Sequence, residues 1–150
     1  MTNYFVATSA LVKYYVAEIG SRWIQTVVNP LVDNVIIICE LTPIEIFSTF
    51  ERRVREKTIT SPNLRILQTA FITDYETKFL SVELEKRIMI QARDLVTTYP
   101  LRPSDAIQLA CALDAAKTLN VPITFLCADS DLLSAAVTEG FTVDNPNLHP

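Results

Sequence analysis

Glycine and histidine are scarce in this chain of 150 residues, which has two glycines and one histidine. With only Gly20 and Gly140, the chain has no glycine-rich loop of the kind that holds phosphates in P-loops and dinucleotide-binding folds. The one histidine, His149, is next to the last residue, where a catalytic histidine held by the fold is rarely found. This scarcity argues against Ser-His-Asp and Cys-His catalysis, and it excludes histidine-rich zinc sites.

Cysteines are also few, and no apolar run is long enough to cross a bilayer. Cys39, Cys111 and Cys127 are widely spaced in apolar stretches and form no CxxC pair, so we interpret them as buried free thiols of a cytoplasmic protein. The first residues lack the pattern of a signal peptide, and no membrane partner is expected. The net charge of −4 weighs mildly against a sequence-independent nucleic-acid binder, although a carboxylate metal site adds negative charge that a cation offsets.

Strand and helix patterns alternate along the chain. Five short apolar runs predict strands at 4–7, 35–39, 79–82, 123–127 and 141–143. Helices are expected from 8 or 9 to 15, and at 20–28, 42–57, 61–78, 83–98, 104–119 and 129–139. Because the strands are continuous apolar runs without alternation, they are typical of a parallel sheet buried on both faces. We therefore predict one α/β domain spanning 1–150, a three-layer α/β/α sandwich with a central, mostly parallel sheet.

Four acidic residues lie where the predicted strands end or the predicted helices begin. They are Glu45, Asp105, Asp129 and Asp131. In a parallel sheet these points converge at the carboxyl edge, where ligands bind. Carboxylate oxygens suit Mg²⁺ or Mn²⁺, and a site without histidine needs a metal to make hydroxide near neutral pH. The pattern therefore indicates hydrolysis of a phosphodiester.

Each of these carboxylates also has a purely structural interpretation. Asp105 could face the positive end of a helix dipole, Asp129 could cap a helix, and Asp131 could be an ordinary first-turn acid. Glu45 is harder to explain in this way, because apolar residues surround it and an unpaired buried carboxylate is costly. The joint arrangement of the four is what favours a functional site.

Basic residues gather near two of the acidic positions. Arg52 and Arg53 lie at the distal end of the predicted helix that contains Glu45, and Arg102 lies just before the helix of Asp105. These three arginines are candidates for binding RNA phosphates beside the metal. For the cluster at the end of the helix, compensation of the helix dipole is an equally good explanation.

Four segments share their order and spacing with a set of known motifs. Residues 4–13, YFVATSALVK, are similar to a first strand and turn that reads hydrophobics and then D-T/S-S-A-L-V-K. Residues 42–46, TPIEI, are similar to a segment with a helical glutamate, and 101–110, LRPSDAIQLA, to L-x-x-x-D-A-x-x-L-A. Residues 125–140 contain D-x-x-L from Asp129 and end in E-G. Over almost its whole length the chain therefore resembles a PIN domain, specifically the VapC-type toxin of bacterial toxin–antitoxin pairs.

The resemblance implies an endoribonuclease that cleaves RNA phosphodiesters with acidic residues around Mg²⁺ or Mn²⁺. Carried over to this chain, the metal ligands are Glu45, Asp105 and Asp129, and the first ligand position falls on Ala7. Ser9, which could orient a carboxylate or a water molecule, and Asp131 are auxiliary. The resemblance further implies a homodimer and a small cognate antitoxin that covers the site.

Alanine at position 7 departs from the motif. A methyl group cannot ligate a metal, and the number of charged ligands tunes such sites strongly, so we expect the chain to be inactive or severely impaired. Ala7 is either an engineered substitution or the mark of a natural degenerate copy. The intact T-S-A-L-V-K pattern that follows it favours engineering, because drift erodes several positions.

Two other functions stay open. The chain could be a catalytically degenerate PIN domain that acts as an RNA- or protein-binding module. It could also be an α/β phosphohydrolase or a receiver-like domain, but such proteins likewise need an aspartate after the first strand, and the lysine common after a late strand is missing. RNA cleavage by an Ala7→Asp variant separates these functions from a nuclease.

Overall fold

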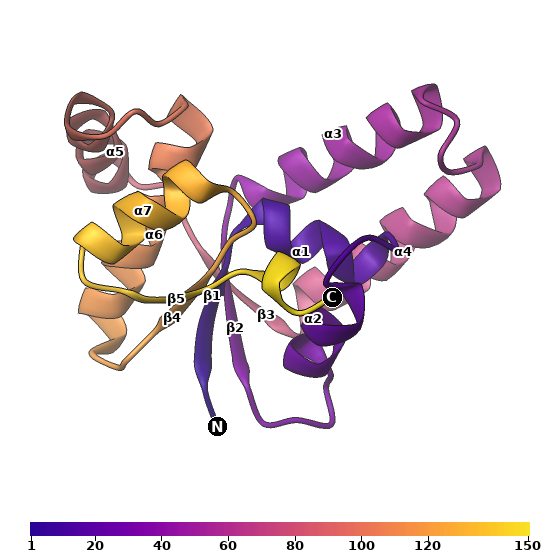
Figure 1. The fold of residues 1–150 in the computed structure, drawn as a ribbon, viewed down its shortest axis with the longest axis horizontal. Helices are drawn as coiled ribbons and strands as arrows, with labels where there is room; N and C mark the ends of the chain where they lie inside the picture. Colours follow the sequence, from indigo (N-terminus) through magenta and orange to yellow (C-terminus); the bar gives the residue numbers. More distant parts are fainter.

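The computed structural model describes residues 1–150 as a five-stranded sheet with helices on both sides (Figure 1). The strands are β1 (Asn3–Val6), β2 (Val35–Cys39), β3 (Phe79–Val82), β4 (Thr124–Leu126) and β5 (Thr142–Asp144). The helices are α1 (Thr8–Tyr15), α2 (Ser21–Val28), α3 (Thr42–Arg55), α4 (Ser61–Thr77), α5 (Lys86–Thr98), α6 (Pro103–Leu119) and α7 (Ser130–Thr138), and a short 3₁₀ helix follows at Pro146–Leu148.

All strand pairs in the sheet are parallel, in the order β3-β2-β1-β4-β5. The register places Phe5 of the central strand β1 beside Ile37 of β2 and Phe125 of β4. Parallel neighbours require crossover connections, and the helices between the strands supply them. The predicted three-layer α/β/α fold is confirmed, and its sheet is entirely parallel.

Two apolar cores lie on the two faces of the sheet, because successive strand residues point to opposite sides. On one face Phe5, Ile37 and Phe125 pack with residues of α5, α6 and α7, and the rings of Phe5 and Phe125 stack with centroids 5.5 Å apart. On the other face Val6 and Leu126 pack with residues of α1, α2, α3 and α4. Burial on both faces explains why the strands are continuous apolar runs.

The ends of several elements differ from the predicted boundaries. β1 ends at Val6, and Ala7 is the extended residue that precedes α1. α3 ends at Arg55, two residues before Lys57, whose positive φ of 61° is outside the helical range. The helix predicted from Glu83 begins instead at Lys86, and the preceding segment is tied to the end of β2 because the backbone N–H of Leu84 donates to the Glu40 carboxylate at 2.6 Å.

The last residues of the chain pack on α2. Gly20, with φ of 86°, lies against the backbone of Pro146, and a Cβ at Gly20 would be 2.3 Å from the Pro146 carbonyl oxygen. The ring of His149 stacks on Trp23 with centroids 4.1 Å apart. Its Nε2 lies 2.8 Å from Oδ1 of Asp144, so the fold holds this histidine although it is next to the last residue.

The three cysteines are buried free thiols that form no disulfide, as predicted. The sulfur atoms of Cys39 and Cys111 lie 3.1 Å apart between β2 and α6. Burial raises the pKa of the Cys127 thiol to about 11, so this thiol stays protonated near neutral pH. None of the seven helices combines the length and the apolar character that a membrane span needs.

Candidate functional site

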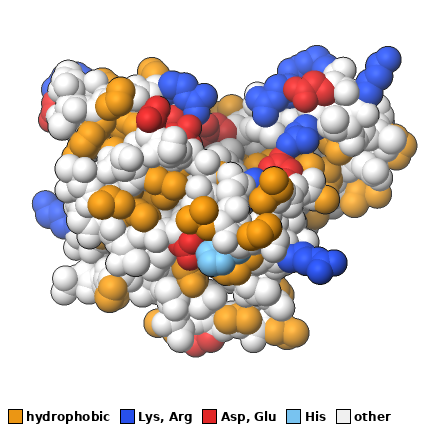
Figure 2. Space-filling view, in the orientation of Figure 1, with side chains coloured by type: hydrophobic (Ala, Val, Ile, Leu, Met, Phe, Trp, Pro, Cys, Tyr) orange, Lys and Arg blue, Asp and Glu red, His pale blue; other side chains and the backbone are white.

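A cleft of about 580 Å³ opens at the carboxyl edge of the sheet (Figure 2). One wall is α3, which projects with α4 as an arm, and the other wall is formed by α6 and the start of α7 (Figure 1). The floor is the junction of β1 and α1. The polar and charged residues that line the cleft are Thr8, Ser9, Lys13, Glu18, Glu45, Ser48, Thr49, Arg52, Arg53, Arg102, Asp105, Gln108 and Asp129.

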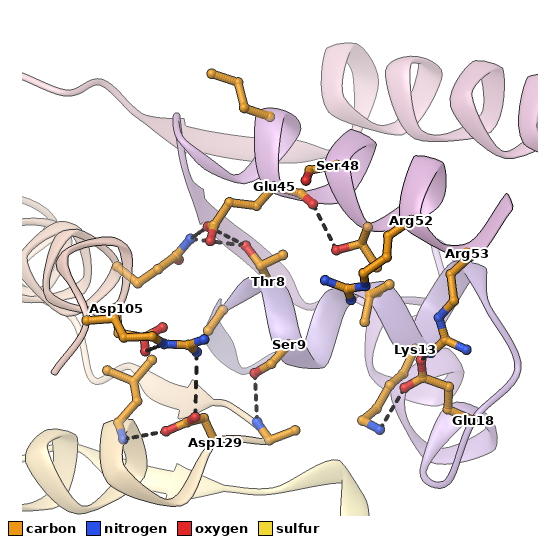
Figure 3. Close-up of a pocket in the computed structure, with 18 residues that line it drawn as sticks. Thr8, Ser9, Lys13, Glu18, Glu45, Ser48, Arg52, Arg53, Asp105 and Asp129 are labelled. Carbon is orange, nitrogen blue, oxygen red and sulfur yellow. Dashed lines mark hydrogen bonds and ion pairs between the residues drawn. The ribbon is translucent and has the colours of Figure 1, made fainter. Parts of the chain in front are cut away.

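Glu45 lies in the first turn of α3 and points toward the floor of the cleft (Figure 3). One of its carboxylate oxygens, Oε1, accepts a hydrogen bond of 2.8 Å from the Thr8 hydroxyl and one of 2.7 Å from Nε2 of Gln108. The half-buried carboxylate is therefore held by two neutral donors, not by a cation. These bonds explain how a carboxylate survives among apolar neighbours, because each donor replaces a hydrogen bond that water would otherwise make.

Asp105 lies in the first turn of α6, and its Oδ2 is 3.1 Å from Nε of Arg102. Burial raises the pKa of the Asp105 carboxyl, Arg102 partly offsets this rise, and the charges of Asp129 and Asp131 add to it. The carboxyl is thus harder to ionise than an exposed aspartate. A cation at this end of the cleft stabilises its charged form.

Asp129 follows β4 and caps α7. Its Oδ1 accepts the backbone N–H of Leu132 at 3.0 Å, so the helix-cap interpretation of this residue is confirmed. Its other oxygen, Oδ2, lies 3.8 Å from a terminal nitrogen of Arg102. Capping uses one oxygen only, and the second faces the cleft beside Asp105.

Ala7 stands at the end of β1 in the same cleft and is 1% exposed. Its backbone N–H donates to the carbonyl of Leu126 at 2.9 Å, which fixes the end of β1 to β4. This hydrogen bond holds the backbone of Ala7 at the carboxyl end of the central strand. The methyl side chain supplies no ligand there.

The guanidinium of Arg102 lies within electrostatic range of three carboxylates. Its pKa is raised by the hydrogen bond to Asp105, and also by the charges of Asp105, Asp129 and Glu45. A cationic side chain among hard oxygen donors indicates that this end of the cleft fits a cation. No three His, Cys, Asp or Glu side chains, however, lie close enough together to hold a metal ion. The carboxylate oxygens of Glu45, Asp105 and Asp129 suit Mg²⁺ or Mn²⁺ by their chemistry.

The other end of the cleft is basic. Lys13, which is buried, and Arg53 both form ion pairs with the Glu18 carboxylate, in the case of Lys13 at 3.1 Å (Figure 3). Arg52 also lines the cleft, is more than half exposed and pairs with Glu56, its Nε lying 3.5 Å from Oε1. Lys13, Arg52 and Arg53 are thus balanced by only two carboxylates, those of Glu18 and Glu56. The excess positive charge suits an anionic ligand.

Most of the predicted site residues meet in this cleft, with two qualifications. Asp131 is exposed in the first turn of α7 and does not line the cleft. Ser9 lines it, but its hydroxyl accepts the backbone N–H of Ala128 at 3.0 Å and contacts no carboxylate. Ser9 thus joins the β1–α1 junction to the β4–α7 loop.

Sequence reasoning missed the polar residues that support Glu45. The sequence offers Thr8 or Ser9 as the cap of the first helix, but Ala7 holds that position and Thr8 is the first residue of α1. The pattern does not single out Gln108. The spacing held a signal, because Gln108 is three residues after Asp105 and so shares its face of the helix. Likewise, the pairing of Lys13 with Glu18, five residues later, gave no pattern that distinguishes it from surface charge.

Comparison with known proteins identifies the fold. No family model matches the chain, and no curated protein matches it. A chain of a toxin–antitoxin complex from Klebsiella pneumoniae superposes with a TM-score of 0.56 at 16% identity, covering 95% of this chain and 97% of that one. FitAcB from Neisseria gonorrhoeae superposes with a TM-score of 0.58 at 14% identity, covering 95% and 96%. The chain therefore shares its fold, over nearly its full length, with these two proteins.

Proposed function

We propose that this chain is the toxin of a bacterial toxin–antitoxin pair, a VapC-type PIN domain built as a Mg²⁺- or Mn²⁺-dependent endoribonuclease. One observation carries the proposal. Glu45, Asp105 and Asp129 come from three separate segments and line one cleft at the carboxyl edge of a parallel sheet. Ala7 lines the same cleft at the end of the central strand, so the missing first ligand impairs catalysis while the architecture is kept.

The three carboxylates have distinct tasks in this proposal. Bound Mg²⁺ or Mn²⁺ would lower the pKa of a water molecule and offset charge on the phosphate. Glu45, which is held at one oxygen by its hydrogen bonds, and Asp129, which caps α7 with one oxygen, would each have a second oxygen free for the cation. Asp105, which pairs with Arg102, would be the third ligand.

The substrate is RNA, and its backbone follows the charge pattern of the cleft. The acidic end would hold the metal at the scissile phosphate, and Arg52, Arg53 and Lys13 at the basic end would bind a neighbouring phosphate. This local separation of charge explains how a chain with a net charge of −4 binds a polyanion. It also requires RNA that is extended enough to enter the cleft, which favours single-stranded segments.

The partner is a small antitoxin that covers the cleft, and the active assembly is a homodimer in the cytoplasm. Support for the antitoxin comes from the solved structure of similar fold that is described as a toxin–antitoxin complex. An acidic side chain of the antitoxin would pair with the basic end of the cleft, and a basic side chain would pair with the acidic end.

A second function is favoured by Ala7 itself. The chain as it stands could bind RNA or an antitoxin without cutting, because Arg102 already pairs with two of the carboxylates. Binding without cleavage is the expected behaviour of the Ala7 chain in both proposals. They differ in what happens when the carboxylate is restored.

The test is RNA cleavage by the Ala7→Asp variant in Mg²⁺ or Mn²⁺. The double variant Ala7→Asp, Glu45→Gln is the negative control, and Ala7→Asp, Asp131→Asn changes an acid outside the cleft. Cleavage by the first and third proteins, abolished in the second, supports the nuclease. A variant that binds RNA but never cuts it supports the binding module, and one that hydrolyses only a phosphomonoester supports a phosphohydrolase.

A further inference from the structure

Gln108 is a polar side chain buried in the helix that carries Asp105. It is 1% exposed, and the neighbouring positions Ala106, Leu109 and Ala110 on α6 are buried and apolar. An amide in such surroundings is costly unless its hydrogen bonds are made. Its contacts therefore indicate what the amide does.

The Gln108 amide group points at Glu45. Its Nε2 lies 2.7 Å from Oε1 of Glu45, and 3.1 Å from each of the hydroxyl oxygens of Thr8 and Thr42. The shortest of the three contacts is the one to the carboxylate, as expected for a donor bound to a charged acceptor. The reversed amide would bring two acceptor oxygens together at that distance, so Glu45 sets the orientation of the amide.

The other end of the amide has no hydrogen-bond partner. Oε1 of Gln108 is buried and unpaired. A side chain that served only to join α6 to its neighbours would be better replaced by an apolar residue, which leaves no unpaired oxygen. The amide is therefore retained although only its donor end is satisfied, and the donor end faces Glu45.

We propose that Gln108 is a positioning residue that fixes Glu45 for metal binding; this rests on the proposed function. Together with Thr8, it binds Oε1 of the carboxylate and leaves the second oxygen to the cation. A carboxylate fixed before the metal arrives loses less freedom on binding. Gln108 thus acts on the metal through Glu45.

The experiment measures Mn²⁺ affinity by calorimetric titration with MnCl₂, using the Ala7→Asp protein as the parent. Gln108→Met, which keeps the unbranched shape, and Gln108→Ala each remove the donor. Thr42→Val is the matched control, because Thr42 is fully buried and contacts Gln108 and Thr8 but not Glu45. Thermal unfolding of all four proteins reports stability separately.

Both Gln108 variants are expected to weaken Mn²⁺ binding by about 10- to 100-fold, the usual effect of removing a group that orients a metal ligand. Thr42→Val is expected to lower the unfolding temperature and keep the parent affinity. Equal affinity in the parent and in either folded Gln108 variant overturns the inference, as does an equal loss of affinity in Thr42→Val. A parent that binds Mn²⁺ but leaves RNA intact overturns the proposed function alone, and a parent that binds no Mn²⁺ overturns both.

Discussion

Nε of Arg102 lies 3.1 Å from Oδ2 of Asp105, three residues further along the chain. The same guanidinium reaches toward Asp129, with a nitrogen 3.8 Å from Oδ2. An internal cation thus rests against two of the carboxylates that we assign to a metal. Its side chain is 74% exposed, and ion pairs so exposed contribute only about 0–1 kcal/mol, so a divalent cation would displace it readily.

Removing this internal competitor is expected to favour the metal. In the Ala7→Asp background, Arg102→Gln should tighten Mn²⁺ binding by up to about fivefold, which corresponds to about 1 kcal/mol of a broken exposed ion pair. Arg93→Gln makes the same charge change on the exposed surface of α5 and should leave the affinity unchanged. Calorimetric titration with MnCl₂ measures both. Weaker binding by Arg102→Gln would show that the arginine supports the site instead of competing for it.

The basic end of the cleft can be tested with two neighbouring arginines. Arg52 lines the cleft, whereas Arg55, on the same helix, does not. Arg52→Gln should weaken binding of single-stranded RNA and lower the slope of log K against log salt by about 0.7, the change expected when one cation no longer binds a phosphate. Arg55→Gln has the same net charge and should keep the parent slope. Identical slopes for the two variants would exclude a phosphate contact at Arg52.

The two glycines offer a matched pair for stability. A Cβ at Gly20 would lie 2.3 Å from the Pro146 carbonyl oxygen, whereas a Cβ at Gly140 would meet no atom within 4 Å. Both have positive φ, so each alanine costs about 1–2 kcal/mol from the backbone conformation. Gly20→Ala should cost about 1–3 kcal/mol more, because it displaces the C-terminal segment from α2. Urea unfolding measures the difference, and equal losses of stability would contradict the close packing of Gly20 on Pro146.

The raised pKa of Tyr15 predicts that the protein loses stability in alkali. Burial raises the pKa of Tyr15 well above its usual range, and the hydrogen bond to Asp74, 2.7 Å long, adds to this rise. The folded chain keeps the phenol proton where the unfolded chain releases it, so stability falls above pH 10 by about 1.4 kcal/mol per pH unit.

The Tyr15→Phe variant lacks that proton and serves as the comparison. At pH 7 it should be less stable than the parent by about 1 kcal/mol, the value of one hydrogen bond. Urea unfolding at a series of pH values between 8 and about 11 should show the two stability curves converging as the pH rises through 10. Parallel curves over this range would mean that Tyr15 ionises normally in the folded protein.

The sequence predicted the sheet and the edge at which the site lies, for one physical reason. Strands buried on both faces are continuous apolar runs, so the predicted strand at 35–39 has the same bounds as β2, and parallel strands bring their carboxyl ends to one edge. Glu45, Asp105 and Asp129 could therefore be assigned to a common cleft. The exposed position of Asp131 could not be predicted, because it depends on the turn at which α7 begins.

Contacts between side chains that are distant along the chain could not be predicted from the sequence. Gln108 is 100 residues from Thr8 and 63 from Glu45, and nothing in their local spacing indicates that the three meet. The pairing of Arg102 with Asp105 was closer in sequence, but a helix-start arginine can equally point to solvent. Such contacts depend on how the helices pack on the sheet.

The most direct test of the proposed nuclease is the rate of single-stranded RNA cleavage by the Ala7→Asp variant relative to the unmodified chain, at saturating Mn²⁺. Removal of a group that merely orients a ligand costs about 10- to 100-fold, so restoring a ligand itself should raise the rate at least about 100-fold. The gain should vanish with EDTA and in the Ala7→Asp, Glu45→Gln double variant. A folded Ala7→Asp protein that binds Mn²⁺ and cuts RNA no faster than the Ala7 chain would contradict the central claim.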